Sequence, residues 1–353
     1  FCRVVDNWGD IGVCWRLARQ LAAEHGLAVR LWVDDLTSLA PLCPLIDARL
    51  NQQYALGVEI CRWPVDFPAT EAADVVIEVF ACALPANYLQ AMCRRPAPPV
   101  WINLEYLSAE CWVEGCHTLA SPHSALPLTK HFFFPGFGER TGGLIMEDGL
   151  LQEREAFQAA LPASERLEIS LFCYESTPIG ALFSAWAEGD NPIRCRVPPG
   201  QPLKAVKTHF GCDGPWQFGN LQVEPIPFLS QPDYDRLLWS CDLNFVRGED
   251  SFVRAQWAGR PFVWQAYWQQ QDTHLLKLDA FLKRYVEGLP APAGKTVGDF
   301  FQAWNRISPQ VARLWPEFLA IFPELKAHNQ RWAEHLSEYR LVNNLVNFCL
   351  GKL

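Results

Sequence analysis

Residues 241–265, CDLNFVRGEDSFVRAQWAGRPFVWQ, constrain the fold of this chain more than any other stretch. The first of them are β-branched and aromatic and predict a buried strand. A polar turn follows, and Asp250 or Ser251 can cap the short helix after it. Gly259 can end that helix in the left-handed conformation, and Pro261 prevents its continuation into the next strand. The stretch therefore predicts a strand–turn–helix–strand unit, the building block of a sheet covered by helices.

The turn of this unit also has the chemistry of a nucleotide site. The N-terminus of a helix presents unpaired N–H groups and the positive end of the helix dipole to an anion. Glu249, directly before the helix, can accept hydrogen bonds from sugar hydroxyls. These features indicate a phosphate and a ribose bound side by side. The alternative is purely structural: Asp250 and Ser251 only cap the helix and Glu249 is only solvated, since most such units bind nothing.

Composition excludes several classes of protein. The chain has 353 residues, half of them hydrophobic, with 15 Trp and a net charge of −9. This length predicts two domains, and the negative charge argues against a nucleic-acid binder or a binder of anionic membranes. We find no signal peptide and no apolar run near the roughly 20 residues of a membrane-spanning helix. Because the chain opens at Phe1 inside a strand-like run, we expect residues before it.

The cysteines predict a reducing compartment. There are 13, an odd number, scattered mostly through apolar runs. Such cysteines are typical of the reduced core of a cytoplasmic protein. Cys111, Cys116, His117 and His123 form the one cluster of metal-ligand types, but their spacing matches no familiar zinc pattern. We therefore expect no metal.

The first half of the chain predicts a doubly wound sheet. A strand over residues 1–5, a helix over 11–25 and a strand over 27–33 give a β-turn-α-β order. Further strands are expected at 74–80 and 99–104. Residues 122–143 are rich in Pro and Gly and are expected to be irregular. The cluster Phe132–Phe134 within them is more typical of buried packing than of a docking surface.

The second half repeats this plan. We expect strands at residues 167–174, 203–206, 221–225 and 243–246, and helices at 179–188 and throughout the region after Val297. Two doubly wound domains in one chain predict the GT-B architecture of nucleotide-sugar glycosyltransferases, in which two Rossmann-like domains face each other across a cleft. Other two-domain α/β enzymes share that arrangement. The sequence contains no G-x-G-x-x-G, Walker, H-E-x-x-H or G-x-S-x-G motif.

Three motifs in the same order closely resemble the EarP family of protein-arginine rhamnosyltransferases, which modify elongation factor P. They are DNWGDIGVCWRLARQLA from Asp6, SLFCYES from Ser170 and FVRGEDSFVRAQWAGRPFVWQ from Phe245. The resemblance covers essentially the whole chain. It implies a GT-B fold, dTDP-β-L-rhamnose as donor, one arginine of elongation factor P as acceptor, inversion at the anomeric carbon, and no cofactor or required metal. It also implies that the modified factor rescues ribosomes stalled at polyproline.

Residues 143–162 have few strand signals and predict the crossing between two domains, to which the resemblance gives separate roles. Residues 1–155 would form an acceptor-binding Rossmann-like domain, on which a C-terminal helix within 336–353 packs. Residues 156–335 would form the nucleotide-sugar donor domain.

Carried across residue by residue, the resemblance places catalysis on Asp10, with Asp6 orienting the acceptor or supporting Asp10. Glu249 is similar to the family's glutamate at the ribose and the catalytic centre. The turn around these aspartates would form the acceptor and sugar pocket, through Asn7, Trp8, Gly9 and Gly12. Without the resemblance, the more economical interpretation of the pair is a helix cap and a strand end.

The donor residues implied by the resemblance are mostly aromatic or lie near the helix N-terminus. Phe172 resembles the aromatic residue that stacks on thymine, with Tyr174 nearby. Tyr234 stands where the family has Phe, which keeps the ring and adds a hydroxyl. The remaining donor-site positions are Gln231, Arg247, Asp250, Ser251 and Tyr267.

Such a transfer needs a held nucleophile and stabilisation of the departing diphosphate. A guanidinium is protonated at neutral pH, with a pKa above about 12. A carboxylate can hold it, localise charge on one nitrogen and take the proton as the C–N bond forms. Two other functions stay open at this point: a GT-B enzyme with another sugar or acceptor, and a silent protein that binds elongation factor P.

Overall fold

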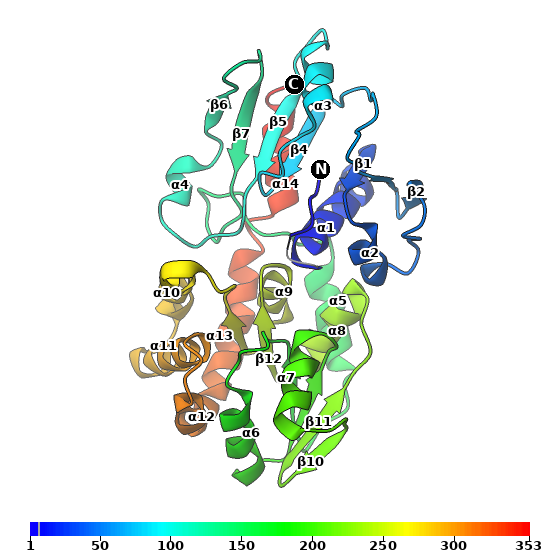
Figure 1. Ribbon diagram of the computed structural model, residues 1–353. Coiled ribbons are helices and arrows are strands. Elements are labelled where there is room, and N and C mark those ends of the chain that lie inside the picture. Colours follow the sequence, from blue (N-terminus) through cyan, green and yellow to red (C-terminus); the bar gives the residue numbers. More distant parts are fainter. Residues whose placement is uncertain (6–7) are drawn as a thin grey trace. The chain divides into compact units, whose positions relative to one another are not determined.

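The computed structural model describes residues 1–5 and 8–353 (Figure 1). Its internal contacts divide the chain into two compact units, Phe1–Asp148 with Leu336–Leu353, and Gly149–His335. The boundary expected at residue 155 lies within helix α5 (Leu150–Ala159). That helix packs on α8 (Gln231–Ser240) and α9 (Asp250–Ala258), and so belongs to the second unit.

The first unit contains two sheets, and the first residues of the chain lie between them. Their orders are β1-β3-β2 and β4-β5-β7-β6. The strands are β1 (Val29–Val33), β2 (Gln52–Ala55), β3 (Val58–Arg62), β4 (Val75–Val79), β5 (Val100–Leu104), β6 (Ala120–Pro122) and β7 (Thr129–Phe133). All neighbours are parallel except β2 against β3 and β6 against β7.

The first residues of the chain join these two sheets. Cys2 pairs in parallel with Val33 of β1, while the Phe1 nitrogen donates to Ile77 O at 2.8 Å and Val79 N donates to Phe1 O at 3.1 Å. The segment thus stands between β1 and β4 as the first strand of a 3-2-1-4-5-6 Rossmann order. Within the described part of the chain, the strand expected over residues 1–5 pairs through its first two residues.

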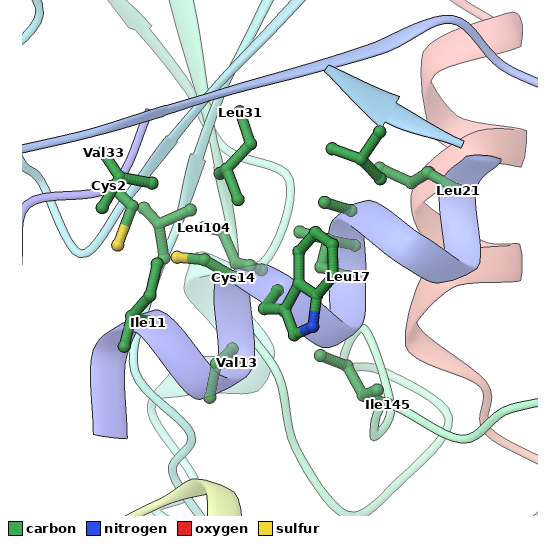
Figure 2. Close-up of a cluster of buried hydrophobic side chains, with 14 of the residues drawn as sticks. Cys2, Ile11, Val13, Cys14, Leu17, Leu21, Leu31, Val33, Leu104 and Ile145 are labelled. Carbon is green, nitrogen blue, oxygen red and sulfur yellow. The ribbon is translucent and has the colours of Figure 1, made fainter. Parts of the chain in front are cut away.

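Helix α1 (Trp8–His25) covers this sheet because its apolar residues recur at spacings of three and four. Figure 2 shows Ile11, Cys14 and Leu17 of α1 together with Leu31 and Leu104. Leu341 and Leu345 of the C-terminal helix α14 (Leu341–Leu350) belong to the same core cluster. Each fully buried side chain of this kind contributes about 1.5–3 kcal/mol to stability. Chain segments from both ends of the sequence therefore build one core.

The expectation of irregular structure over residues 122–143 is wrong in its centre. Strand β7 lies there, between β5 and β6. Its sequence, TKHFF, has little apolar pattern of its own, so the sheet on both sides decides its conformation. Phe133 and Phe134 are buried, as expected, and Phe132 is half-buried.

The second unit is built on one sheet of order β10-β11-β9-β8-β12-β13. The strands are β8 (Leu167–Leu171), β9 (Ile193–Val197), β10 (Trp216–Phe218), β11 (Leu221–Pro225), β12 (Leu243–Arg247) and β13 (Phe262–Gln265). Only β10 is antiparallel to its neighbour. Without that hairpin strand, the order in the sheet is 3-2-1-4-5. Its topological switch point lies between β8 and β12, where a doubly wound sheet binds its ligand.

One strand of this unit was predicted in the wrong place. Residues 203–206 lie in helix α7 (Gln201–Phe210), and the strand is instead β9, over residues for which no strand is predicted. Leu, Lys and Ala are good helix formers, and Pro202 is tolerated in the first turn of a helix. Residues 203–206 therefore form part of a helix, in which Ala205 and Val206 are buried and Lys204 is exposed. Helix α6 (Ile179–Glu188) has the predicted bounds.

The other helical segments are short connections in the first unit and a long series in the second. They are α2 (Leu36–Leu39), η1 (Ala40–Leu42), α3 (Ala86–Cys93), α4 (Val113–Cys116), η2 (Gln270–Asp272), α10 (Thr273–Tyr285), η3 (Val286–Gly288), α11 (Ala291–Asn305), α12 (Gln310–Ala320) and α13 (Phe322–Leu336). Among the described residues, no helix combines the length and the apolar character needed to cross a bilayer.

Candidate functional site

The predicted donor residues of the second unit gather at its switch point. Phe172 and Tyr174 follow β8, and Arg247 ends β12. The two strands are hydrogen-bonded neighbours, with Phe245 opposite Leu171. Residues that are more than 70 positions apart in the sequence therefore lie together at the carboxyl edge of the sheet.

The Arg247 guanidinium lies against two aromatic rings. Its Cζ is 4.6 Å from the ring centroid of Phe172 and 4.5 Å from that of Tyr174. Phe172 also meets Tyr234 edge to face at 6.0 Å, and Tyr174 meets Tyr267 at 5.9 Å. Arg247 is 8% exposed, and its Nε has no hydrogen-bond partner among the described residues. A cation held by ring faces keeps its donors available to an anion.

The turn after β12 is held by its own side chains. Ser251 Oγ donates to Arg247 O and accepts from Arg247 N at 3.2 Å. Trp264 Nε1 donates to Gly248 O at 2.9 Å, where Gly248 takes a φ of +67° that favours glycine. The turn is thus closed by contacts to β12 and β13.

The prediction that Asp250 or Ser251 caps α9 is wrong. Glu249 occupies the N-cap position and makes no side-chain cap hydrogen bond, while the Ser251 hydroxyl bonds back to the end of β12. The first N–H groups of a helix have no partner within the helix. A helix start without a side-chain cap at its N-cap residue, beside the Arg247 guanidinium, is a site for an anion.

A buried ion pair fixes this helix to its neighbour. Arg254 of α9 donates to Asp235 of α8, Nε to Oδ1 at 2.9 Å and Nη2 to Oδ2 at 2.8 Å. Both side chains are nearly inaccessible, and loss of one partner of such a pair costs about 3–5 kcal/mol. The pair positions the start of α8, where Gln231 and Tyr234 are buried or half-buried. Burial raises the pKa of Tyr234 far above its ordinary value.

Gln265 also supports the candidate donor site, although the sequence alone did not indicate this role. Gln265 at the end of β13 accepts hydrogen bonds through Oε1 from Tyr174 N at 2.9 Å and from Thr177 Oγ1 at 3.1 Å. It therefore holds the segment after β8 that carries the aromatic rings. Gln265 closes the motif that begins at Phe245, and its position at a strand end is the signal that could have identified it.

Asp10 lies in the first unit, within the first turn of α1. It is 4% exposed, and its Oδ2 accepts a hydrogen bond from Val5 N at 2.9 Å. Helix α1 begins at Trp8, so Asp10 does not occupy the N-cap position expected for a purely structural role. Trp8 and Gly9 are half-buried and Gly12 is buried. Asp6 and Asn7 lie outside the described residues.

Of the cysteine and histidine cluster in the first unit, His117 contacts the backbone after β7. His117 Nδ1 accepts a hydrogen bond from Phe134 N at 3.1 Å, and burial lowers the pKa of His117 to about 4. No group of three or more His, Cys, Asp or Glu side chains with the arrangement of a metal site occurs among the described residues. All 13 cysteines, each within the described part of the chain, are free thiols.

Known proteins resemble this chain over its whole length. The family model for the elongation factor P rhamnosyltransferase EarP matches residues 1–350. The protein-arginine rhamnosyltransferase of Pseudomonas putida is 48% identical over 373 aligned residues, which cover 100% of this chain and 98% of that protein.

Two solved structures also match. One, described as the structural basis for EarP-mediated arginine glycosylation of translation elongation factor EF-P, has a TM-score of 0.68 and 35% identity, and covers 100% of this chain and 98% of its own. MurG of Acinetobacter baumannii has a TM-score of 0.55 at 14% identity, over 99% of this chain and 98% of its own, and supports the GT-B fold alone. The chain, with its two Rossmann-like units, has the GT-B fold and belongs to the EarP family.

Proposed function

We propose that this protein transfers L-rhamnose from dTDP-β-L-rhamnose to a single arginine of elongation factor P, with inversion at the anomeric carbon and without a metal. The observation that carries the proposal is the Arg247 guanidinium, held between Phe172 and Tyr174 beside the start of α9. Family membership supports the sugar and the acceptor, since the relatives are described as protein-arginine rhamnosyltransferases.

The departing diphosphate is stabilised by the second unit. Negative charge develops on the leaving group as the glycosidic bond breaks. Arg247 supplies a full positive charge, and the first-turn amides of α9, including those of Asp250 and Ser251, supply N–H donors. The Ser251 hydroxyl already bonds to Arg247 O, so in this arrangement Ser251 acts mainly through its backbone. These groups can replace the metal that many transferases use.

The nucleoside is bound by the aromatic residues around Arg247. Phe172 and Tyr174 present ring surface for thymine, and Tyr234 supports Phe172 at its edge. Glu249, which is half-buried at the start of α9, accepts hydrogen bonds from the ribose and contributes to catalysis. Gln231 and Tyr267 complete the donor site.

The acceptor is activated by a carboxylate of the first unit. Asp10 accepts hydrogen bonds from the guanidinium of the acceptor and takes its proton as the C–N bond forms. The Val5 N–H engages Oδ2 and so orients the carboxylate. Asp6 acts with it, because two carboxylates localise the charge of a guanidinium better than one.

We place this reaction in the cytoplasm, with elongation factor P as the partner that offers its arginine-bearing loop. The 13 free thiols, all in described residues, support a reducing compartment. The modified factor would then act on ribosomes stalled at polyproline.

Mass spectrometry tests the proposal directly. The protein is incubated with purified elongation factor P and dTDP-rhamnose, and we expect one added deoxyhexose on one arginine. An acceptor in which that arginine is replaced by Lys should remain unmodified. Transfer at full rate in the presence of EDTA checks metal independence, and NMR of the product linkage checks inversion.

The same experiment separates the alternatives. Transfer from a different nucleotide sugar alone would show a GT-B enzyme with another donor. Binding of elongation factor P without release of dTDP would show a silent binding protein. Either result would contradict the proposed reaction.

A further inference from the structure

The carboxyl ends of β4 and β5 in the first unit carry a pair of stacked rings that the proposed mechanism does not use. The centroids of Phe80 and Tyr106 are 3.9 Å apart, with an angle of 1° between the ring planes. Phe80 is half-buried, whereas Tyr106 is 44% exposed. Phe80 therefore supports one face of the Tyr106 ring, while part of Tyr106 faces solvent.

The backbone beneath this stack adopts a strained conformation. Phe80 and Ala81 have φ values of +56° and +51°, in the left-handed region that residues other than glycine rarely adopt. Asn103, which is fully buried, holds this conformation, because its Oδ1 accepts from Ala81 N at 3.0 Å. Strain of this kind persists where the surrounding structure requires it and gathers at functional sites.

The same asparagine also holds the carboxylate of the residue that precedes Tyr106 in the chain. Asn103 Nδ2 donates to the side chain of Glu105, the residue before Tyr106. Burial raises the pKa of Glu105. Asn103 and Lys130 lower this pKa, but by less than burial raises it. Lys130 itself forms its ion pair with Glu78, at 2.5 Å. Lys130 thus acts on Glu105 through electrostatic attraction and not through its own ion pair.

Phe80, Glu105 and Tyr106 follow the carboxyl ends of parallel strands. The N-terminal segment that precedes Asp10 ends at the same edge of this sheet. The segment that begins at Phe1 is the hydrogen-bonded neighbour of β4, and it runs in the same direction toward Val5, whose amide binds Asp10. The switch point of the first unit thus has Asp10 after its first strand and Phe80 after the next. Glu105 and Tyr106 follow β5, one strand further along.

An exposed ring face beside a carboxylate is the chemistry that recognises a guanidinium. The planar cation stacks on the ring, and its N–H groups donate to the carboxylate. We propose that Tyr106 and Glu105 bind the guanidinium of the acceptor arginine and hold its plane, as positioning residues for the transfer. This inference rests on the proposed function, because it requires an arginine as acceptor.

Binding measured without the donor tests the inference. Titration calorimetry with elongation factor P compares the wild type with Tyr106→Ala, Tyr106→Phe and Glu105→Gln. We expect Tyr106→Ala and Glu105→Gln each to raise the Kd about tenfold and Tyr106→Phe to stay within about twofold, since it keeps the stack. Tyr54→Ala, which removes an exposed tyrosine of edge strand β2, is the matched control and should leave the Kd unchanged.

A second acceptor shows whether the contact is with the guanidinium. Elongation factor P with its acceptor arginine replaced by Met should bind the wild type and Tyr106→Ala about equally. Equal weakening of both acceptors by Tyr106→Ala would overturn the inference, because the tyrosine would then contact another part of the partner. An unchanged Kd for Tyr106→Ala and Glu105→Gln with the arginine acceptor would overturn it as well.

The controls separate this inference from the proposed function and from misfolding. The melting temperature and dTDP affinity of each variant should match the wild type, and Glu105→Gln provides a readout if Tyr106→Ala unfolds. If the wild type modifies elongation factor P while both variants bind it normally, only this inference fails. If the wild type neither binds nor modifies the factor, the proposed function fails and the inference fails with it.

Discussion

The two switch points of the molecule share a topology but differ in charge. In the first unit the strand ends lead to carboxylates, Asp10 and Glu105. In the second they lead to the cation Arg247 and to the N-terminus of α9. In the proposed reaction, the same 3-2-1-4 arrangement of parallel strands serves a guanidinium at one sheet and a diphosphate at the other, because the fold positions strand ends and the side chains supply the chemistry.

Asp10→Asn alters only the first unit. It should give the largest effect on transfer, because it removes the proposed base. We expect transfer to elongation factor P to fall by about 10³-fold or more, because Asn cannot take the proton, while dTDP binding stays within about twofold. Asn can still accept the hydrogen bond from Val5 N. Mass spectrometry of the product and calorimetry with dTDP measure the two effects. Turnover near the wild-type rate would contradict the assignment of Asp10 as the base.

Arg247→Met is the corresponding change in the second unit, because it removes the charged side chain proposed to act there. The change removes the charge beside α9 and should weaken dTDP binding by about 10- to 100-fold, the range expected for hydrogen bonds to a charged group. Affinity for thymidine, which lacks phosphate, should change much less. Calorimetry at two salt concentrations measures both ligands, with Arg166→Met at an exposed position as the control. An equal loss for dTDP and thymidine would show that Arg247 only orders the rings.

Phe172→Ala distinguishes a ligand-binding ring from a core ring. Phe172 is half-buried and carries Arg247 over its face, so its loss should weaken dTDP binding about tenfold with little change in melting temperature. Phe183 of α6 is 1% exposed, and Phe183→Ala should instead lower the free energy of unfolding by about 3–5 kcal/mol. Thermal unfolding and calorimetry on both variants decide the matter. A large fall in melting temperature for Phe172→Ala without selective loss of dTDP binding would identify it as a core residue.

Gly259→Ala should give the smallest effect, on stability alone. Gly259 ends α9 with a φ of +60°, and an added Cβ would lie 2.8 Å from Arg154 Nη1. Gly26 ends α1 with nearly the same φ of +62°, but a Cβ there would meet nothing within 4 Å. We expect Gly26→Ala to cost about 1 kcal/mol and Gly259→Ala somewhat more. Denaturant unfolding measures the difference, and equal costs would mean that Arg154 moves aside freely.

Much of the fold was predictable because it depends on local patterns. The stretch from Cys241 to Gln265 forms the predicted strand, turn, helix and strand, and Gly259 takes the predicted left-handed conformation. The errors fall where tertiary context overrides local pattern. Strand β7 forms from a weakly patterned sequence between two neighbouring strands, and residues 203–206 belong to a helix.

By itself, the sequence determined the α/β class, the helix and strand order around Arg247 and the residue types at both candidate sites. Only the tertiary structure decided which of these residues meet: Arg247 with Phe172 and Tyr174, and Phe80 with Tyr106. The physical reason is strand order. A local pattern dictates that a strand forms, whereas its neighbour in the sheet depends on how all the apolar faces of the unit are buried together.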